Sequence, residues 1–189
     1  MRFRNSCRSL PGLPGHFALR VLMAAQLLSC TFIPAVPSQA ASLEYEVKAA
    51  FLFNFTKFVQ WPPASAGADA PFTICIVGDD PFGRALDDIV QGENVNGHRI
   101  SVQRLQAGPQ NSCQLEYIAK NYSIPANALE AGSGVLTVGE GDDFVRRGGI
   151  VGFVIDDRRV RFDISLKTAT NAGLKLSSKL LAVARSVEK

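Results

Sequence analysis

Few residues beyond the first forty could do covalent chemistry: one histidine, His98, and two cysteines, Cys75 and Cys113. A catalytic set of Ser, His and Asp or of Cys and His would have to use His98. The Gly-x-Ser-x-Gly elbow of hydrolases is absent, and the cysteines lack the Cys-x-x-Cys spacing of thioredoxin-like enzymes. These three residues are also too few for a zinc site. The sequence therefore predicts no catalytic residue and no metal site.

Four pairs of adjacent aspartates are the next candidates, because paired carboxylates can bind calcium or transfer protons. Each pair lies at a predicted helix start, helix surface or turn, where aspartate caps backbone N–H groups. None has the alternating ligand spacing of a calcium loop. We expect structural roles for the pairs, which are Asp79-Asp80, Asp87-Asp88, Asp142-Asp143 and Asp156-Asp157.

Gly78 and Gly83 lie between a predicted strand and a predicted helix, where nucleotide-binding loops occur. A phosphate loop ends in Gly-Lys-Ser/Thr, whereas Arg84-Ala85 follows Gly83 here. The pair Asp79-Asp80 would also repel a phosphate group. We therefore expect no nucleotide and no other cofactor.

The first forty residues have the pattern of a secretion signal. They contain four arginines and no acidic residue, run apolar from Val21 to Val36, and end in Ser38-Gln39-Ala40. This pattern predicts export with cleavage after Ala40, which leaves 41–189 as a single domain. The segment Leu27-Leu28-Ser29-Cys30 resembles a lipoprotein box, so acylation at Cys30 is the alternative.

The charge of the chain depends on this leader. The whole chain has 20 basic and 17 acidic residues, but without the four leader arginines the acidic residues are in slight excess. No basic surface for nucleic acid is therefore predicted. We also expect no membrane span after the leader, because no later apolar segment reaches 18 residues.

A long helix is predicted to begin after Ser42 as its N-cap and to end before Pro62-Pro63. Apolar residues keep helical spacing from Val47 to Val59, and further aromatic residues extend the apolar surface around the helix. The helix is more apolar than one buried face requires. It either packs between the sheet and a neighbouring element or also contacts a partner chain.

The remaining pattern predicts an α/β fold. The segment 72–78 is an apolar run typical of a strand buried on both faces, and helix signals follow it at Asp80 and Leu86. Strands separated by helices predict a mainly parallel sheet flanked by helices, a three-layer sandwich whose last two strands form an antiparallel hairpin at the edge. If the strand order is flavodoxin-like, 2-1-3-4-5, the first and third strands are neighbours. Further strands are predicted at 99–105, 113–118, 135–138, 150–155 and 160–164, with helices near 125–130, 166–172 and 177–187.

Cys75 and Cys113 are an even pair in an exported chain, which favours a disulfide; two buried free thiols are the alternative. The flavodoxin-like order makes the first and third strands neighbours and would bring the two cysteines together.

The densest charge of one sign lies near the C-terminus, on the predicted hairpin and after it. Alternation along the strand places Arg159 and Arg161 on one side, opposite Val160. The cluster is either a solvated face or a contact for an acidic partner. It comprises Arg158, Arg159, Arg161, Lys175 and Lys179.

Several motifs resemble the YfiR-like family of periplasmic proteins. They are EVKAAFLFNFTKFVQWP at 46–62, GDDPFG at 78–83, RGG at 147–149, VRFDI at 160–164 and AGLKLSSKLL at 172–181. The similarity covers nearly all of residues 44–185.

The resemblance implies a non-enzymatic periplasmic regulator of cyclic-di-GMP signalling and biofilm formation. Such a protein inhibits an inner-membrane diguanylate cyclase through its periplasmic region and is itself sequestered by an outer-membrane lipoprotein. The resemblance also implies an α/β sandwich, a tendency to dimerise, and a disulfide at the positions of Cys75 and Cys113. A second cysteine pair of the best-known member is missing, since Val145 and Gly152 stand in that region.

The expected function is thus binding and regulation of a membrane signalling protein. The candidate partner contacts are Phe51, Phe55, Trp61, Arg159, Arg161, Lys175 and Lys179. The alternative is a small-molecule binding protein whose ligand lies at the carboxyl ends of the strands, near 79–83 and 139–143.

Overall fold

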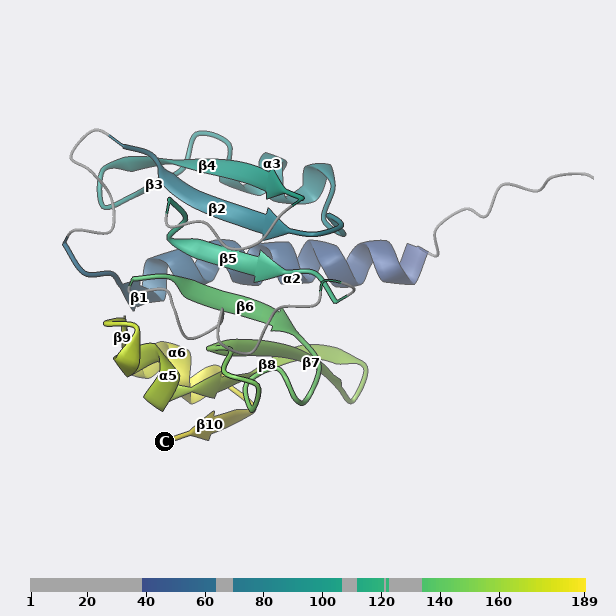
Figure 1. Cartoon of the computed structure of the whole chain (residues 1–189). Coiled ribbons are helices and arrows are strands. Elements are labelled where there is room, and N and C mark those ends of the chain that lie inside the picture. The colour runs from purple at the N-terminus through teal and green to yellow at the C-terminus, as the bar shows by residue number, and fades with distance from the viewer. Residues whose placement is uncertain (1–38, 64–69, 107–111, 121, 123–133) are drawn as a thin grey trace, which may run out of the picture. The chain divides into compact units, whose positions relative to one another are not determined.

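The computed structural model describes residues 39–63, 70–106, 112–120, 122 and 134–189, without the side chains of 39–41. These residues belong to one compact unit, Pro37–Lys189. An eight-stranded sheet of order β10-β8-β7-β6-β5-β2-β4-β3 forms its centre, and helices flank the sheet (Figure 1). The helices are α2 Gln39–Phe58, α3 Arg84–Val90, α5 Leu166–Asn171 and α6 Ser178–Val183. The strands are β1 Val59–Gln60, β2 Phe72–Val77, β3 Asn94–Val95, β4 His98–Leu105, β5 Leu115–Ile118, β6 Leu136–Glu140, β7 Val151–Asp156, β8 Arg159–Ser165, β9 Lys175–Leu176 and β10 Ser186–Glu188.

The sheet confirms the predicted α/β class, and its order of β4-β2-β5-β6-β7 is the flavodoxin-like one that the sequence pattern left conditional. Strands β4, β2, β5, β6 and β7 lie side by side and parallel, and β8 pairs antiparallel with β7. All six residues of β2 and all four of β5 are buried, so both faces of the sheet are covered at its centre. The hairpin is not the edge of the sheet, however, because β10 adds a parallel strand to part of β8.

The first helix, α2, lies along the sheet and runs opposite to the parallel strands, with its N-terminal end at their carboxyl ends (Figure 1). It begins at Gln39, three residues before Ser42, so Ser42 lies inside the helix and is not its N-cap as predicted. The Ser42 hydroxyl donates to Glu46 at 3.3 Å. The buried stripe of α2 lies along Ala49, Leu52 and Phe55. Tight packing of this apolar stripe fixes the helix on the sheet.

The end of the chain differs from its prediction. Ser177 caps a helix as expected, since its hydroxyl accepts from the Leu180 N–H at 3.2 Å. The helix ends at Val183 rather than Val187, because the following residues form β10. A two-stranded sheet of β1 and β9 was not predicted. The helix predicted near 125–130 lies outside the described residues.

The connection from β6 to β7 depends on two glycines. The ring of Phe144 lies between Gly139 and Gly149, and a Cβ atom at either glycine would lie 2.2 or 2.1 Å from it. Such an approach is shorter than any van der Waals contact, so neither position can hold a side chain without moving the ring.

Candidate interaction surface

The aromatic side chains of α2 mostly pack inward. Phe55 is 1% exposed, and its ring lies 5.1 Å from that of Phe162 and 5.9 Å from that of Phe153. Phe51 is half-buried against the same two rings. The expectation that Phe55 is an exposed contact residue is therefore wrong, because its ring fills the core between α2 and the β7–β8 hairpin.

Trp61 follows β1 and is also engaged within the fold. Its Nε1 donates to the backbone oxygen of Gln114 at 2.9 Å, and its ring meets Phe72 edge to face at 4.9 Å. The indole N–H and one side of the ring are thus used to hold the chain after α2 against the sheet.

The outer face of α2 exposes other large apolar side chains instead. Leu43 is 61% exposed and Val47 is 38% exposed, and Phe58 is also exposed. On β7, Ile155 is 52% exposed. Val47 and Phe58 belong to the apolar stripe that the sequence pattern predicted, but the helix buries a stripe rotated away from them. These exposed residues were missed because helical spacing alone does not show which side of an all-round apolar helix meets the sheet.

The candidate cations divide into two groups. Arg159 and Arg161 are exposed on β8, on the side opposite Val160, as alternation predicts. Lys175 on β9 and Lys179 on α6 are also exposed, but they lie at the other end of the sheet from the hairpin turn (Figure 1). The fold does not bring the four cations into one patch.

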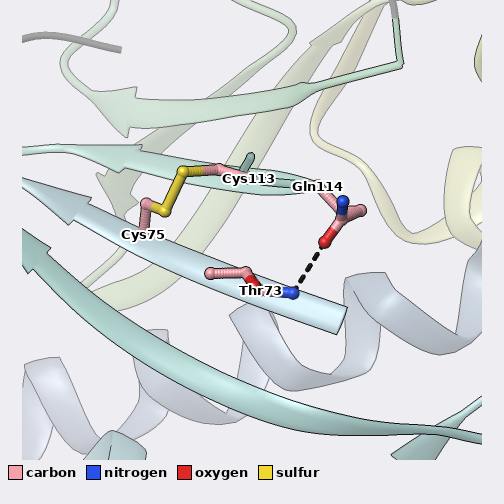
Figure 2. Close-up of a disulfide and its surroundings, with 4 residues drawn as sticks. All are labelled: Thr73, Cys75, Cys113 and Gln114. Atoms are coloured by element: carbon pink, nitrogen blue, oxygen red, sulfur yellow. Dashed lines mark hydrogen bonds between the residues drawn. A yellow bond between two sulfur atoms is a disulfide. The ribbon is translucent and has the colours of Figure 1, made fainter. Parts of the chain in front are cut away.

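The predicted disulfide is present between Cys75 and Cys113, with a Cα–Cα distance of 5.9 Å (Figure 2). Both residues are buried. The neighbouring Gln114 side chain accepts from the Thr73 N–H at 2.7 Å. The disulfide and this hydrogen bond both join β2 to the segment that leads into β5, which stiffens the centre of the sheet.

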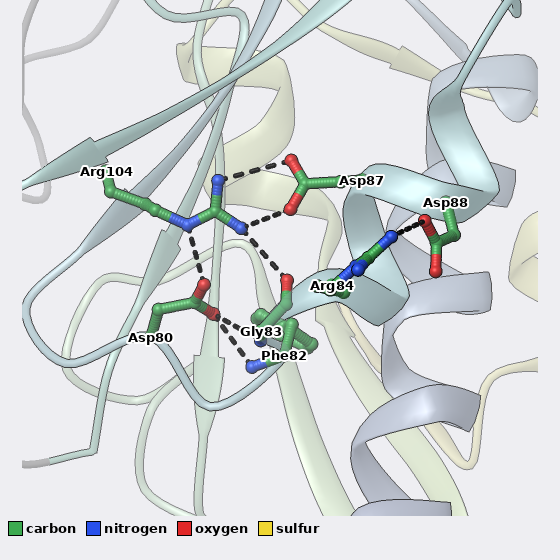
Figure 3. Close-up of polar contacts among 7 residues, drawn as sticks. All are labelled: Asp80, Phe82, Gly83, Arg84, Asp87, Asp88 and Arg104. Carbon is green, nitrogen blue, oxygen red and sulfur yellow. Dashed lines mark hydrogen bonds and ion pairs between the residues drawn. The ribbon is translucent and has the colours of Figure 1, made fainter.

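The turn between β2 and α3 is held by carboxylates and one arginine (Figure 3). Asp80 accepts from the N–H groups of Phe82 and Gly83 at 2.7 and 3.3 Å. Asp80 was predicted to cap the helix, but α3 begins only at Arg84 with Gly83 at its N-cap position, so Asp80 caps the turn before the helix instead.

Arg104 of β4 completes this turn. Its guanidinium donates to Asp80 at 2.7 Å, to Asp87 at 2.6 Å and to the Gly83 carbonyl at 2.9 Å. Hydrogen bonds to Asp87 and Asp80 raise the pKa of Arg104 above its usual range, so the cation is permanent. Asp80 and Asp87, one from each of two predicted pairs, therefore have a structural role as ion-pair partners of Arg104.

A buried polar cluster joins α2 to the carboxyl end of β6. Lys48 is 2% exposed, and its ammonium lies 2.5 Å from Glu44 Oε1 and 3.0 Å from Glu140 Oε2. The hydroxyl of Tyr117 donates to Glu140, and Lys48 lies over the Tyr45 ring at 4.5 Å. The spacing of Glu44 and Lys48 by four residues was the only sequence signal for this cluster.

The two tyrosines of the cluster are held in the neutral form. Burial raises the pKa of Tyr45 to about 12, and the negative charge of Glu140 acts in the same direction. Burial, followed by the charge of Glu140, raises the pKa of Tyr117 well above its usual range. Both hydroxyls therefore act as hydrogen-bond donors at ordinary pH.

A cavity of about 280 Å³ opens beside this cluster, at the carboxyl ends of β5 and β6. Its charged lining is mixed: Lys120 and Arg147 are basic, whereas Glu140 and Asp143 are acidic. Arg147 and Asp143 pair with each other at 2.9 Å. The cavity lies in one of the two regions where a small-molecule ligand was predicted.

Within the described ranges, no group of three or more His, Cys, Asp or Glu side chains is placed to hold a metal ion. None of the helices in the same ranges is long and apolar enough to cross a membrane.

The sequence pattern described as YfiR/HmsC-like matches residues 45–185. No curated protein matches the chain. Among solved structures, the chain is similar to a conserved domain protein from Vibrio cholerae, with a TM-score of 0.45 and 12% sequence identity. The similarity covers 76% of this chain and 60% of the Vibrio chain.

Proposed function

The chain belongs to the YfiR/HmsC-like family, and from this membership we propose that it is an exported regulator of an inner-membrane signalling protein, a diguanylate cyclase. The family consists of periplasmic regulators rather than enzymes, and its pattern covers residues 45–185, nearly the whole described fold. This family match is the observation that carries the proposal.

Export through the leader, with cleavage after Ala40, is part of the proposal. The Cys75–Cys113 disulfide supports it, because disulfides persist in oxidising compartments such as the periplasm. On the basis of the family, we also propose that an outer-membrane lipoprotein releases the membrane protein from inhibition and that the regulator forms a homodimer.

The regulator acts by binding alone. To inhibit a cyclase, it must bind the inactive conformation of the receptor more tightly than the active one, and a tenfold preference corresponds to about 1.4 kcal/mol. A rigid surface suits this role, since little ordering entropy is then lost on binding. The disulfide, the Arg104 contacts and the Lys48 cluster all restrain the sheet and α2.

Deletion of the gene in its native host tests this function. We expect a changed cellular level of cyclic-di-GMP and changed biofilm mass, both restored by the wild-type gene supplied on a plasmid. An unchanged level in the deletion strain, together with no membrane protein retained by the purified chain, would contradict the proposal.

The cavity at β5 and β6 favours a second candidate function, binding of a small periplasmic metabolite. A thermal-shift screen of metabolites distinguishes the two functions, because a ligand that binds the folded state raises the melting temperature. Stabilisation that is lost when Lys120 is replaced by alanine would support this second function.

A further inference from the structure

The side of α2 that is turned away from the sheet carries a continuous row of side chains, which we call the α2 stripe. Its members follow one another at intervals of three or four residues, so they share one side of the helix. They are Leu43, Val47, Ala50, Asn54 and Phe58. Leu52, on the opposite side of the helix, is fully buried. By contrast, Leu43 is 61% exposed, Val47 38% and Phe58 36%, so the stripe leaves three large apolar side chains in water.

The middle of the α2 stripe suits close contact with another helix. Intervals that alternate between four and three residues are the spacing of helix–helix seams. Ala50, at the centre, is small and half-buried, so the axis of a second helix can come near. Asn54 is exposed one turn later, and a polar asparagine within such a seam favours one alignment of the two helices over others. The stripe therefore has the pattern of a seam for a second helix.

Two opposite charges border the same edge of the α2 stripe. Glu46 is exposed near the start of the helix, and within the described residues its carboxylate contacts Ser42 and no cation. Lys57 is 46% exposed near the end of the helix, where its ammonium lies over the Phe53 ring and 3.9 Å from Glu93. About three helical turns separate Glu46 from Lys57, so both project from the same edge. The stripe thus has an acidic group at one end and a basic group at the other.

This pattern is complementary to itself. The midpoint between Leu43 and Phe58 falls within the helical turn that contains Ala50, and so does the midpoint between Glu46 and Lys57. A two-fold axis through that turn lays a second α2 antiparallel on the first and keeps the charged edges on the same side. Each Glu46 then faces Lys57 of the second copy, whereas a parallel pair would place each charge at the level of its own equivalent.

We propose that the α2 stripe is the two-fold interface of a homodimer in which two α2 helices pack antiparallel. The inference rests on the homodimer of the proposed function and names the surface that forms it. A second copy fits the stripe better than a bilayer does, because helices that lie on membranes have polar faces rich in Lys and Arg. Anionic headgroups would repel Glu46, whereas a second copy supplies Lys57 to it.

Sedimentation velocity of the protein purified from the periplasm, at a series of concentrations, tests this interface. One helix pair buries less surface than most stable dimers, so we expect a reversible wild-type dimer whose fraction rises with concentration. Glu46→Lys sets lysines against Lys57 at both ends of the interface, and Lys57→Glu sets glutamates against Glu46. Each single variant is expected to weaken the dimer by about tenfold or more.

A mixture of the two charge variants identifies the partner as a second copy. One variant then carries lysine and the other glutamate at both positions, so every contact in a mixed pair joins opposite charges. An equimolar mixture of Glu46→Lys and Lys57→Glu is therefore expected to form a dimer about as tight as the wild type, although each variant alone is largely monomeric. A stripe that contacts any other molecule would not produce this recovery.

Two further variants separate the apolar contact from a general effect of charge. Val47→Gln keeps a good helix former but removes an apolar group from the stripe, and it is expected to weaken the dimer. Arg161→Glu is the matched control for charge reversal, because Arg161 is exposed on the face of β8 opposite to the one that packs against α2, and the dimer should not change. Equal melting temperatures, measured at dilutions where all variants are monomeric, show that folding is intact.

The outcomes that overturn the proposal are distinct. A wild type that stays monomeric at every concentration removes both this interface and the homodimer, and the regulatory function still stands. A wild-type dimer that Glu46→Lys and Val47→Gln leave unchanged places the interface elsewhere. A monomeric wild type that sediments with vesicles of phosphatidylethanolamine and phosphatidylglycerol, when Val47→Gln does not, assigns the stripe to a membrane. Gene deletion without effect on cyclic-di-GMP contradicts the regulatory function and leaves the dimer measurement unaffected.

Discussion

The ammonium of Lys48, in the middle of α2, lies 3.0 Å from Glu140 at the end of β6. The two residues are 2% and 11% exposed at their side chains. This pair fastens the middle of the helix to the carboxyl end of a central strand. Because of this pair, a substitution at Glu140, outside the apolar core, also affects how firmly α2 is held on the sheet.

Replacement of Glu140 by alanine is expected to lower the free energy of unfolding by about 3 kcal/mol, because a buried ammonium then loses one of its two carboxylates. Urea denaturation followed by circular dichroism measures the change. Lys57→Ala is the control: that lysine is 46% exposed and 3.9 Å from Glu93, so its loss should cost less than about 1 kcal/mol. Equal losses in the two variants would refute the structural role of the Lys48 pair.

Alkaline pH should destabilise the fold through Tyr45. Its pKa rises from about 10 in the unfolded chain to about 12 in the folded protein. Because the folded state favours the neutral form, this stabilisation is fully present below pH 10 and is lost as the pH rises through about 12. Tyr45→Phe keeps the ring and cannot ionise, so its melting temperature should fall less steeply from pH 9 to 12. Identical slopes for wild type and variant would argue against this cause.

Removal of the disulfide is expected to destabilise the domain. Cys75 and Cys113 are 38 residues apart, and closing such a loop corresponds to about 4 kcal/mol in the chain-entropy account. Thermal unfolding of the Cys75→Ala, Cys113→Ala double variant measures the loss. A reductant should lower the melting temperature of the wild type and leave that of the double variant unchanged. If reductant added to the unfolded wild type leaves its melting temperature after refolding unchanged, the bond does not form.

Gly149→Ala should destabilise the β6–β7 connection by about 1–3 kcal/mol, because the new Cβ atom would lie 2.1 Å from the Phe144 ring. A smaller side chain at position 144 relieves this overlap. Addition of Phe144→Leu should therefore cost less in the Gly149→Ala background than in the wild type, and a double-mutant cycle measures the difference. Strict additivity would show that the two residues are not in contact.

Much of the fold could be predicted from local patterns. The apolar run at 72–78 predicted a strand buried on both faces, and the alternation of strands with helices predicted the mainly parallel sheet. The disulfide was predicted from an even pair of cysteines in an exported chain, and a flavodoxin-like strand order agrees with it because it places Cys75 near Cys113. The capping role of Asp80 was predicted only in kind, since Asp80 caps the turn before the helix and not the helix itself. These features depend on neighbours in the sequence or on general rules of chain connection.

The surface could not be predicted in the same way. Phe55 and Val47 both lie in an apolar helix, and only the docking of α2 on the β7–β8 hairpin buries the first and exposes the second. Likewise, Glu140 reaches Lys48 across 92 positions because β6 ends beneath α2. The sequence by itself determined the α/β class and the absence of a recognised catalytic motif. The tertiary structure decided which faces remain open, because burial depends on packing between distant segments rather than on the pattern within one.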